Sequence, residues 1–165
     1  MTGAPSPSLQ IRKAAEPDVP LILAFIRKLA EYERMSHKVV STEDHLRDAM
    51  FGPRPVVETL LAYSAGEPVG FALYFETYST FRGRRGIYLE DLFVEPSHRG
   101  QGIGASLLAA VAKEAQQREG WLQWLVLDWN QPAIEFYQRL GAVRVAEWDA
   151  YRLDGDALAR LAHSR

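Results

Sequence analysis

The sequence predicts a single domain of the mixed α/β class, with a central sheet flanked by helices. Apolar, β-prone runs alternate with segments whose apolar residues recur at helical spacing, in the order β-α-α-β-β-β-α-β-α-β. At 165 residues the chain can bury the core of one domain, and its 47% apolar fraction is ordinary for a globular protein. We expect this domain over residues 9–165, after a flexible arm over residues 1–8.

The composition argues against several classes of protein. A net charge of −2 gives no global attraction to nucleic acid or to an anionic membrane, and no apolar stretch is long enough to span a bilayer. The N-terminus lacks the basic and apolar regions of a signal peptide, so a cytoplasmic location is expected. Cysteine is absent, and the four histidines show no metal-ligand spacing, so we expect no metal site.

The first half of the chain alternates between the two periodicities. The strands are recognised by alternating or continuous apolar residues, and the helices by apolar residues three and four apart. Turn residues and capping residues separate them. The expected elements are a strand over 9–13, a helix that opens at Pro17 and ends over 32–35, a helix capped by Ser41 or Thr42 and running through Phe51, and antiparallel strands over 56–63 and 68–78.

The second half follows a polar loop over 79–86, which carries three arginines and has the composition of a solvated hairpin tip. A near-continuous apolar run over 121–127 predicts a strand buried on both faces. Asn130 and Gly141 have the residue types of a helix cap and a helix stop. The expected elements are a strand over 87–94, a helix with Ile103, Leu107, Leu108, Val111 and Ala115 on one face, the strand over 121–127, a helix between Asn130 and Gly141, a last strand over 143–153 and a short helix over 155–162.

The stretch over 88–105, YLEDLFVEPSHRGQGIGA, contains the strongest functional signal. Glu90 and Asp91 interrupt an apolar strand, and a buried carboxylate is costly unless it is paired or used. After the turn come Arg99 and three glycines, and then the start of a helix. Glycine lets a ligand approach the backbone, a helix start offers free N–H groups, and arginine adds a cation. This pattern favours a site for a phosphorylated cofactor, and a glycine-rich turn with solvated charges is the alternative.

A Rossmann dinucleotide site uses the same glycines. Gly100-x-Gly102-x-x-Ala105 fits its fingerprint, and Asp128 could be its ribose-binding acid. However, residues 95–99 separate the strand from the glycines, and little chain remains beyond Asp128 for the further strands of that fold.

Several motifs together resemble the GNAT acetyltransferase superfamily, and within it the spermidine/spermine (diamine) and thialysine acetyltransferases. The resemblance covers about residues 9–162. Its motifs are Leu29-Ala30-x-Tyr32-Glu33-x-Met35, Gly70-Phe71-Ala72-x-Tyr74, Tyr88-Leu89-Glu90-Asp91-Leu92-Phe93-Val94, Arg99-x-x-Gly102-x-Gly104, Trp129-Asn130-x-Pro132 and Phe136-Tyr137-x-Arg139-x-Gly141-Ala142.

The resemblance implies the GNAT fold, a mostly antiparallel sheet that is splayed between the fourth and fifth strands. The splay would expose backbone groups that can pair with the pantetheine arm of acetyl-CoA, the expected co-substrate. It also implies a homodimer. The expected cofactor-binding residues are Leu92, Phe93, Val94, Arg99, Gly100, Gln101, Gly102, Ile103, Gly104, Ala105, Asn130, Pro132 and Ala133.

Two residues are the candidates for proton transfer. Glu90 would take the proton of the attacking ammonium, and Tyr137 would protonate the departing thiolate. Direct attack is expected because the chain has no cysteine to carry the acyl group. From the residues alone, Glu90 could instead pair with a nearby cation, and Tyr137 could be a core aromatic. Asp91 is not expected to act, because neighbouring strand residues face opposite sides.

The resemblance implies that the acceptor amine contacts Tyr32, Glu33, Glu90, Phe81, Trp124 and Asp149. From the residues alone, Glu33 could equally be a solvated acid at a helix end. The basic loop over 79–86 favours a small amine, a diamine or a lysine-like amino acid over spermine. Two alternatives remain: a GNAT enzyme that acts on a protein N-terminus or lysine, and a non-catalytic sensor of CoA or a nucleotide.

Overall fold

The computed structural model of the chain describes residues 8–164. It contains two compact units, the first ending at Leu125 and the second beginning at Val126. The expected single domain over 9–165 therefore stays a prediction. The predicted arm over 1–8 lies outside the described residues, apart from Ser8. Between residues 8 and 164, no helix combines the length and the apolarity that crossing a membrane requires.

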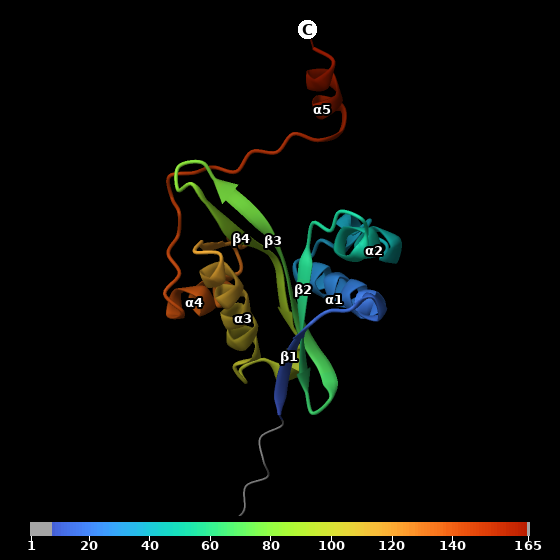
Figure 1. Cartoon of the computed structure of the whole chain (residues 1–165), viewed down its shortest axis with the longest axis vertical. Coiled ribbons are helices and arrows are strands. Elements are labelled where there is room, and N and C mark those ends of the chain that lie inside the picture. The colour runs from blue at the N-terminus through green and yellow to red at the C-terminus, as the bar shows by residue number, and fades with distance from the viewer. Residues whose placement is uncertain (1–7, 165) are drawn as a thin grey trace, which may run out of the picture. The chain divides into compact units, whose positions relative to one another are not determined.

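The first unit contains a sheet of five strands in the order β1-β2-β3-β4-β5 (Figure 1). The pairs β1–β2, β2–β3 and β3–β4 are antiparallel, and only β4–β5 is parallel. This confirms the mixed α/β class and the mostly antiparallel sheet, and the Rossmann alternative is wrong because that fold needs a parallel sheet. The strands are β1 (Leu9–Lys13), β2 (Glu58–Ser64), β3 (Glu67–Ser79), β4 (Arg84–Val94) and β5 (Leu122–Gln123).

Helices α1 (Val19–Tyr32) and α2 (Glu43–Phe51) cover one face of this sheet (Figure 1). Alternation along β3 directs Phe71 and Leu73 to this α1 face, where they join one core cluster with Ile22 and Phe25 of α1 and Phe93 of β4. The rings of Phe25 and Phe71 stack with centroids 5.6 Å apart. Packing of these apolar side chains therefore fixes α1 against β3 and β4.

Helix α3 (Ile103–Gln117) covers the opposite face of the sheet (Figure 1). Its predicted apolar face is confirmed, because Ile103, Leu107, Leu108, Val111 and Ala115 are all buried. Gly70 of β3 allows the close approach: a Cβ there would lie 3.4 Å from Cδ1 of Leu107 and 2.5 Å from the Phe93 carbonyl oxygen.

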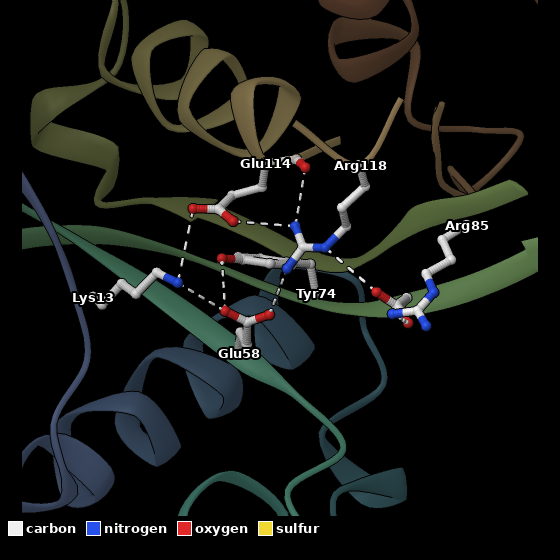
Figure 2. Close-up of polar contacts among 7 residues, drawn as sticks. Lys13, Glu58, Tyr74, Arg85, Glu114 and Arg118 are labelled. Carbon is white, nitrogen blue, oxygen red and sulfur yellow. Dashed lines mark hydrogen bonds and ion pairs between the residues drawn. The ribbon is translucent and has the colours of Figure 1, made fainter. Parts of the chain in front are cut away.

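An ionic network lies on this α3 face, with Arg118 at its centre (Figure 2). The Arg118 guanidinium lies 3.1 Å from carboxylate oxygens of Glu58 and Glu114 and 3.4 Å from one of Glu76. Glu76 is also 3.3 Å from the guanidinium of Arg85. Glu58, Glu76 and Glu114 are called the paired carboxylates below.

Lys13 and Tyr74 extend the network to β1 and to the sheet interior (Figure 2). The Lys13 ammonium lies 3.0 Å from Glu58 and 3.8 Å from Glu114, and its hydrogen bond to Glu58 raises the pKa of Lys13. The fully buried Tyr74 donates its hydroxyl hydrogen to Glu58 at 3.5 Å. Burial, and then the charge of Glu58, raise the pKa of Tyr74, so the phenol stays protonated.

Two strand predictions in the second half of the chain are wrong: one strand is shorter than predicted, and the other does not form. The strand expected over 121–127 is reduced to Leu122–Gln123, and residues 143–153 form no strand although the structure describes all of them. A near-continuous apolar run predicted the strand over 121–127, but a strand buried on both faces needs a hydrogen-bonded neighbour along each edge. Among residues 8–164, β5 pairs only with β4, and Val143, Val145, Trp148 and Tyr151 are exposed.

The second unit contains α4 (Gln131–Arg139) and α5 (Gly155–Ala162). The predicted cap of α4 is confirmed: Oδ1 of Asn130 accepts a hydrogen bond from the Ala133 N–H at 3.4 Å, and Pro132 lies in the first turn. Gly141 follows the helix with φ +88°, the left-handed conformation expected of a glycine stop.

Candidate active site

A β-bulge in β4 falls at Glu90. Asp91 lies opposite Leu73 of β3 and Leu89 lies opposite Tyr74, so Glu90 is an extra residue with no partner in β3. A bulge of this kind interrupts the alternation of side chains along a strand.

The bulge places both carboxylates of the Glu-Asp pair on the α1 face. Tyr88 lies opposite Phe75, which is two residues from Leu73 and shares its face, so Tyr88 and Asp91 share that face as well. Glu90, one residue past Leu89, also lies on the Tyr88 side. The expectation that Asp91 faces away from Glu90 is therefore wrong, since it assumed an unbroken strand.

The surroundings of Asp91 favour the protonated form of its carboxyl group. Burial raises the pKa of Asp91 to about 7, and the charges of Glu90 and Glu33 add to the effect. Burial also raises the pKa of Glu33. Among residues 8–164, no ion pair involves any of these three acids. Glu33, Glu90 and Asp91 are called the unpaired carboxylates below, and together they favour a bound cation.

The end of α1 brings Glu33 to this group. The N–H of Met35 bonds the carbonyl of Ala30 at 2.7 Å, and the N–H of Arg34 bonds that of Glu31 at 3.0 Å. This is the Schellman pattern, with Arg34 in the left-handed position at φ 60° where glycine is usual. The motif stops the helix just after Tyr32 and Glu33, which sequence analysis had assigned to the amine.

The loop between β4 and α3 has the geometry that the glycines predicted. Gly100 and Gly102 have φ of +76° and +79°. Apart from their chain neighbours, no atom of the described residues lies within 4 Å of a Cβ built at either position. Gly102 is the N-cap of α3, so the N–H groups of Ile103, Gly104 and Ala105 begin a helix that has no capping side chain. Open space beside such N–H groups suits a phosphate.

Arg99 and the free edge of β4 extend this loop. The Arg99 Nε donates to the Val94 carbonyl at 3.0 Å. Pairing of β4 with β5 is confined, within the described residues, to Ile87 and Tyr88, so the later part of β4 has no strand neighbour on that edge. Because the Glu95 N–H bonds to β3, strand alternation points the polar backbone groups of Leu92 and Val94 to this free edge. This is the edge that the predicted splay requires.

The remaining predicted site residues are distributed over the β3–β4 turn, the segment after β5 and the second unit. Phe81 is 93% exposed in the β3–β4 turn, and Trp124 is partly buried after β5. In the second unit, Tyr137 is partly buried on α4, and its ring centroid lies 5.2 Å from that of Phe136. Asn130 is buried and Asp149 is exposed. The structure therefore brings together the candidates on α1, β4 and the glycine loop, whereas those on α4 and beyond belong to a separate unit.

The basic loop is shorter than predicted, because β3 continues through Ser79 and β4 begins at Arg84. Its arginines contact the first unit. The Arg82 guanidinium lies 5.1 Å from the Trp121 ring centroid, and Arg84 donates to the Glu119 carbonyl at 3.3 Å. Arg85 belongs to the network around Arg118. All three arginines are nevertheless exposed, as expected of a solvated hairpin tip.

These features first define a class: a mixed α/β fold whose fourth strand leads through a glycine turn to a helix start that has no capping side chain. Residues 24–142 match the Acetyltransferase (GNAT) family, and the chain belongs to that family. It is an acetyltransferase, as the sequence motifs predicted.

Individual relatives agree with this family. A thialysine N-epsilon-acetyltransferase of Sus scrofa is 43% identical over 168 residues, covering 94% of this chain and 98% of the relative. An L-ornithine N5-acetyltransferase of Arabidopsis thaliana is 34% identical and covers 90% of this chain and 86% of the relative. Among solved structures, an integron cassette protein of the V. cholerae mobile metagenome superposes with a TM-score of 0.79 at 26% identity, covering 95% and 99% of the two chains.

Proposed function

We propose that this acetyltransferase moves the acetyl group of acetyl-CoA to a primary amine of a small molecule by direct attack. The amine is a diamine, a polyamine or a lysine-like amino acid such as thialysine, with a small acceptor favoured over spermine. The observation that carries this proposal is the bulge at Glu90, which puts Glu90 and Asp91 on the α1 face, where the charge of Glu33 also acts on Asp91. The names of the relatives support it, because thialysine and ornithine both carry a side-chain amine.

The cofactor assignment follows from the open glycine loop. The first N–H groups of α3 and the Arg99 guanidinium would bind the phosphates, and Leu92 and Val94 would pair with the pantetheine amides. Acetyl-CoA supplies an acyl group already activated as a thioester. Asn130, Pro132 and Ala133, in the first turn of α4, complete the proposed cofactor-binding set.

The unpaired carboxylates act on the acceptor. An ammonium has no lone pair, and an amine has a pKa of ~10, so it must lose a proton before it attacks. Glu90 would accept that proton directly or through water, while Glu33 and Asp91 hold the positive charge nearby. The amine nitrogen then bonds to the carbonyl carbon, the carbon–sulfur bond breaks, and the thiolate leaves with a proton from Tyr137. The second proton that the nitrogen loses restores the Tyr137 hydroxyl.

The Tyr137 assignment rests on the family motif and has a clear test. Tyr137→Phe keeps the ring and removes only the hydroxyl. We expect kcat to fall on the order of 10²-fold while the affinity for acetyl-CoA and the melting temperature stay unchanged. A core aromatic would behave differently: kcat would be intact, and any effect would be confined to stability.

Release of free thiol with a panel of acceptors tests the substrate class. We expect kcat/KM to be higher for thialysine, ornithine and a short diamine than for spermine or a peptide with a free N-terminus. A peptide as the best acceptor would favour the protein-directed alternative. Binding of acetyl-CoA without thiol release for any acceptor would favour the sensor, and spermine as the best acceptor would contradict the role given to the arginines.

Phe81, Trp124 and Asp149 remain proposed acceptor contacts, to be tested by their effect on the KM for the amine. A homodimer in the cytoplasm is also proposed, on resemblance alone. Sedimentation that gives a monomer at micromolar concentration would contradict the dimer.

A further inference from the structure

Two contacts join the last turns of α1 to the segment before the glycine loop. The Arg99 guanidinium carbon lies 4.8 Å from the ring centroid of Tyr32, and Lys28 forms an ion pair with Glu95. The family resemblance implies that Tyr32 contacts the amine. In the structure its ring instead faces the cation of the proposed phosphate loop.

The orientation of Arg99 is set from three directions. Its Nε–H is bonded to the Val94 carbonyl, the Tyr32 ring lies at 4.8 Å, and the Phe93 ring lies at 5.8 Å. Four N–H groups remain on the two Nη atoms, and within residues 8–164 none of them has a hydrogen-bond acceptor. The planar guanidinium is thus fixed at its base and on its face, while the donors that fit a phosphate bidentately stay available.

Neighbouring residues at the helix end therefore serve different parts of the site. Tyr32 is the last residue of α1 and Glu33 is its C-cap, and the Schellman motif follows them. Tyr32 contacts Arg99, whereas the charge of Glu33 acts on Asp91.

We propose that Tyr32 is a positioning residue for the cofactor: its ring holds the Arg99 guanidinium in the orientation that binds the phosphates, and it does not bind the amine. This inference rests on the proposed function of the glycine loop. It separates the two residues that the sequence pattern had grouped, because only Glu33 belongs to the acceptor site.

Calorimetry with CoA tests the proposal in four variants of the full chain: Tyr32→Leu, Tyr32→Phe, Arg99→Ala and the double variant Tyr32→Leu/Arg99→Ala. Tyr32→Leu should weaken CoA binding about 5-fold, as loss of a cation–π contact implies. Tyr32→Phe keeps the ring and should bind normally. In the Arg99→Ala background, Tyr32→Leu should have no further effect, because the group that it orients is gone.

A second readout separates positioning from a general structural role. S-acetylpantetheine lacks the phosphates, so Tyr32→Leu should lower kcat/KM with acetyl-CoA but not with this truncated donor, and the KM for the amine should not change. An equal loss in the Arg99→Ala background, or a raised amine KM with normal CoA affinity, would overturn the inference while leaving the loop assignment intact. Normal CoA binding by Arg99→Ala would overturn both the inference and the proposed phosphate site.

Discussion

The two faces of the sheet differ in whether their carboxylates are paired with cations. On the α3 face, each of the paired carboxylates lies within 3.4 Å of the Arg118 guanidinium, and Lys13 and Arg85 add further positive charge (Figure 2). On the α1 face, the unpaired carboxylates contact no cation in the described part of the chain, and their mutual repulsion helps to raise the pKa of Asp91 to about 7. Both groups are acidic, but only the first is neutralised by the protein itself.

The difference separates a structural role from a functional one. A carboxylate paired with arginine connects elements of the fold, here β1, β2, β3 and α3. A carboxylate left beside other carboxylates makes the folded state less stable, and such strain is concentrated at sites that bind something. The missing positive charge on the α1 face is the charge that an ammonium substrate would bring.

The largest effect is expected from Glu90→Gln, which keeps the shape of the side chain but removes its charge and its basicity. We expect kcat/KM to fall on the order of 10²-fold near neutral pH, with a deficit that shrinks as pH rises and more of the amine is already neutral. The measurement is the pH profile of kcat/KM for the variant and the wild type.

Glu67→Gln, at the exposed β2–β3 turn, is the matched control and should leave the profile unchanged. A deficit in Glu90→Gln that stays constant with pH would make Glu90 a structural residue and would weaken the contrast between the two faces.

A smaller effect, on stability, is expected from Arg118→Met. The variant leaves the three paired carboxylates without their shared cation. We expect the free energy of unfolding to fall by roughly 2 kcal/mol, because these side chains are only partly buried. The kcat of the folded protein should not change, because the network lies on the face opposite the proposed acceptor site. Urea denaturation measures the loss, and Lys113→Met, which removes an exposed cation from the same helix, should cost much less.

The next prediction concerns two aspartates, whose replacement should change the free energy of unfolding in opposite directions. Folding raises the pKa of Asp91, so between pH ~4 and 7 this carboxyl is more often protonated in the folded protein than in the unfolded chain. The stability that Asp91 contributes is therefore lost as pH rises through this window. Asp91→Asn should therefore raise the free energy of unfolding by roughly 2 kcal/mol at pH 8 and by much less at pH 4.

Asp18 is the matched comparison, because Arg12 holds it bidentately at 2.7 and 2.9 Å and lowers its pKa. Its contribution is present at neutral pH and is lost as pH falls through that lowered pKa. Asp18→Asn should therefore lower the free energy of unfolding by about 1 kcal/mol at pH 8. Destabilisation by both variants at pH 8 would remove the distinction between paired and unpaired carboxylates.

Local patterns predicted most of the fold correctly. The apolar face of α3, the Thr42 cap of α2 and the left-handed Gly141 all depend on residues within a few positions of one another. The strand over 121–127 is shorter than predicted and the strand over 143–153 is absent, because the local sequence does not reveal whether a second strand is available for pairing.

The candidate site shows the same limit. The glycines and Arg99 predicted the loop, since turn conformation and charge are properties of the local sequence. Asp91 was set aside because the bulge at Glu90 depends on the register between β3 and β4, which the sequence of β4 does not contain. The Glu-Asp pair in an apolar strand was the only available signal.

Titration of the Asp91 carboxyl carbon by ¹³C NMR tests the central claim most directly, namely that the acids of the α1 face are left unneutralised. Asp91→Asn assigns the signal. We predict a midpoint near 7, which moves downward in Glu90→Gln and in Glu33→Gln because the charges of both residues raise it. A midpoint near ~4 that neither variant moves would contradict the account, because Asp91 would then behave as an ordinary solvated carboxylate.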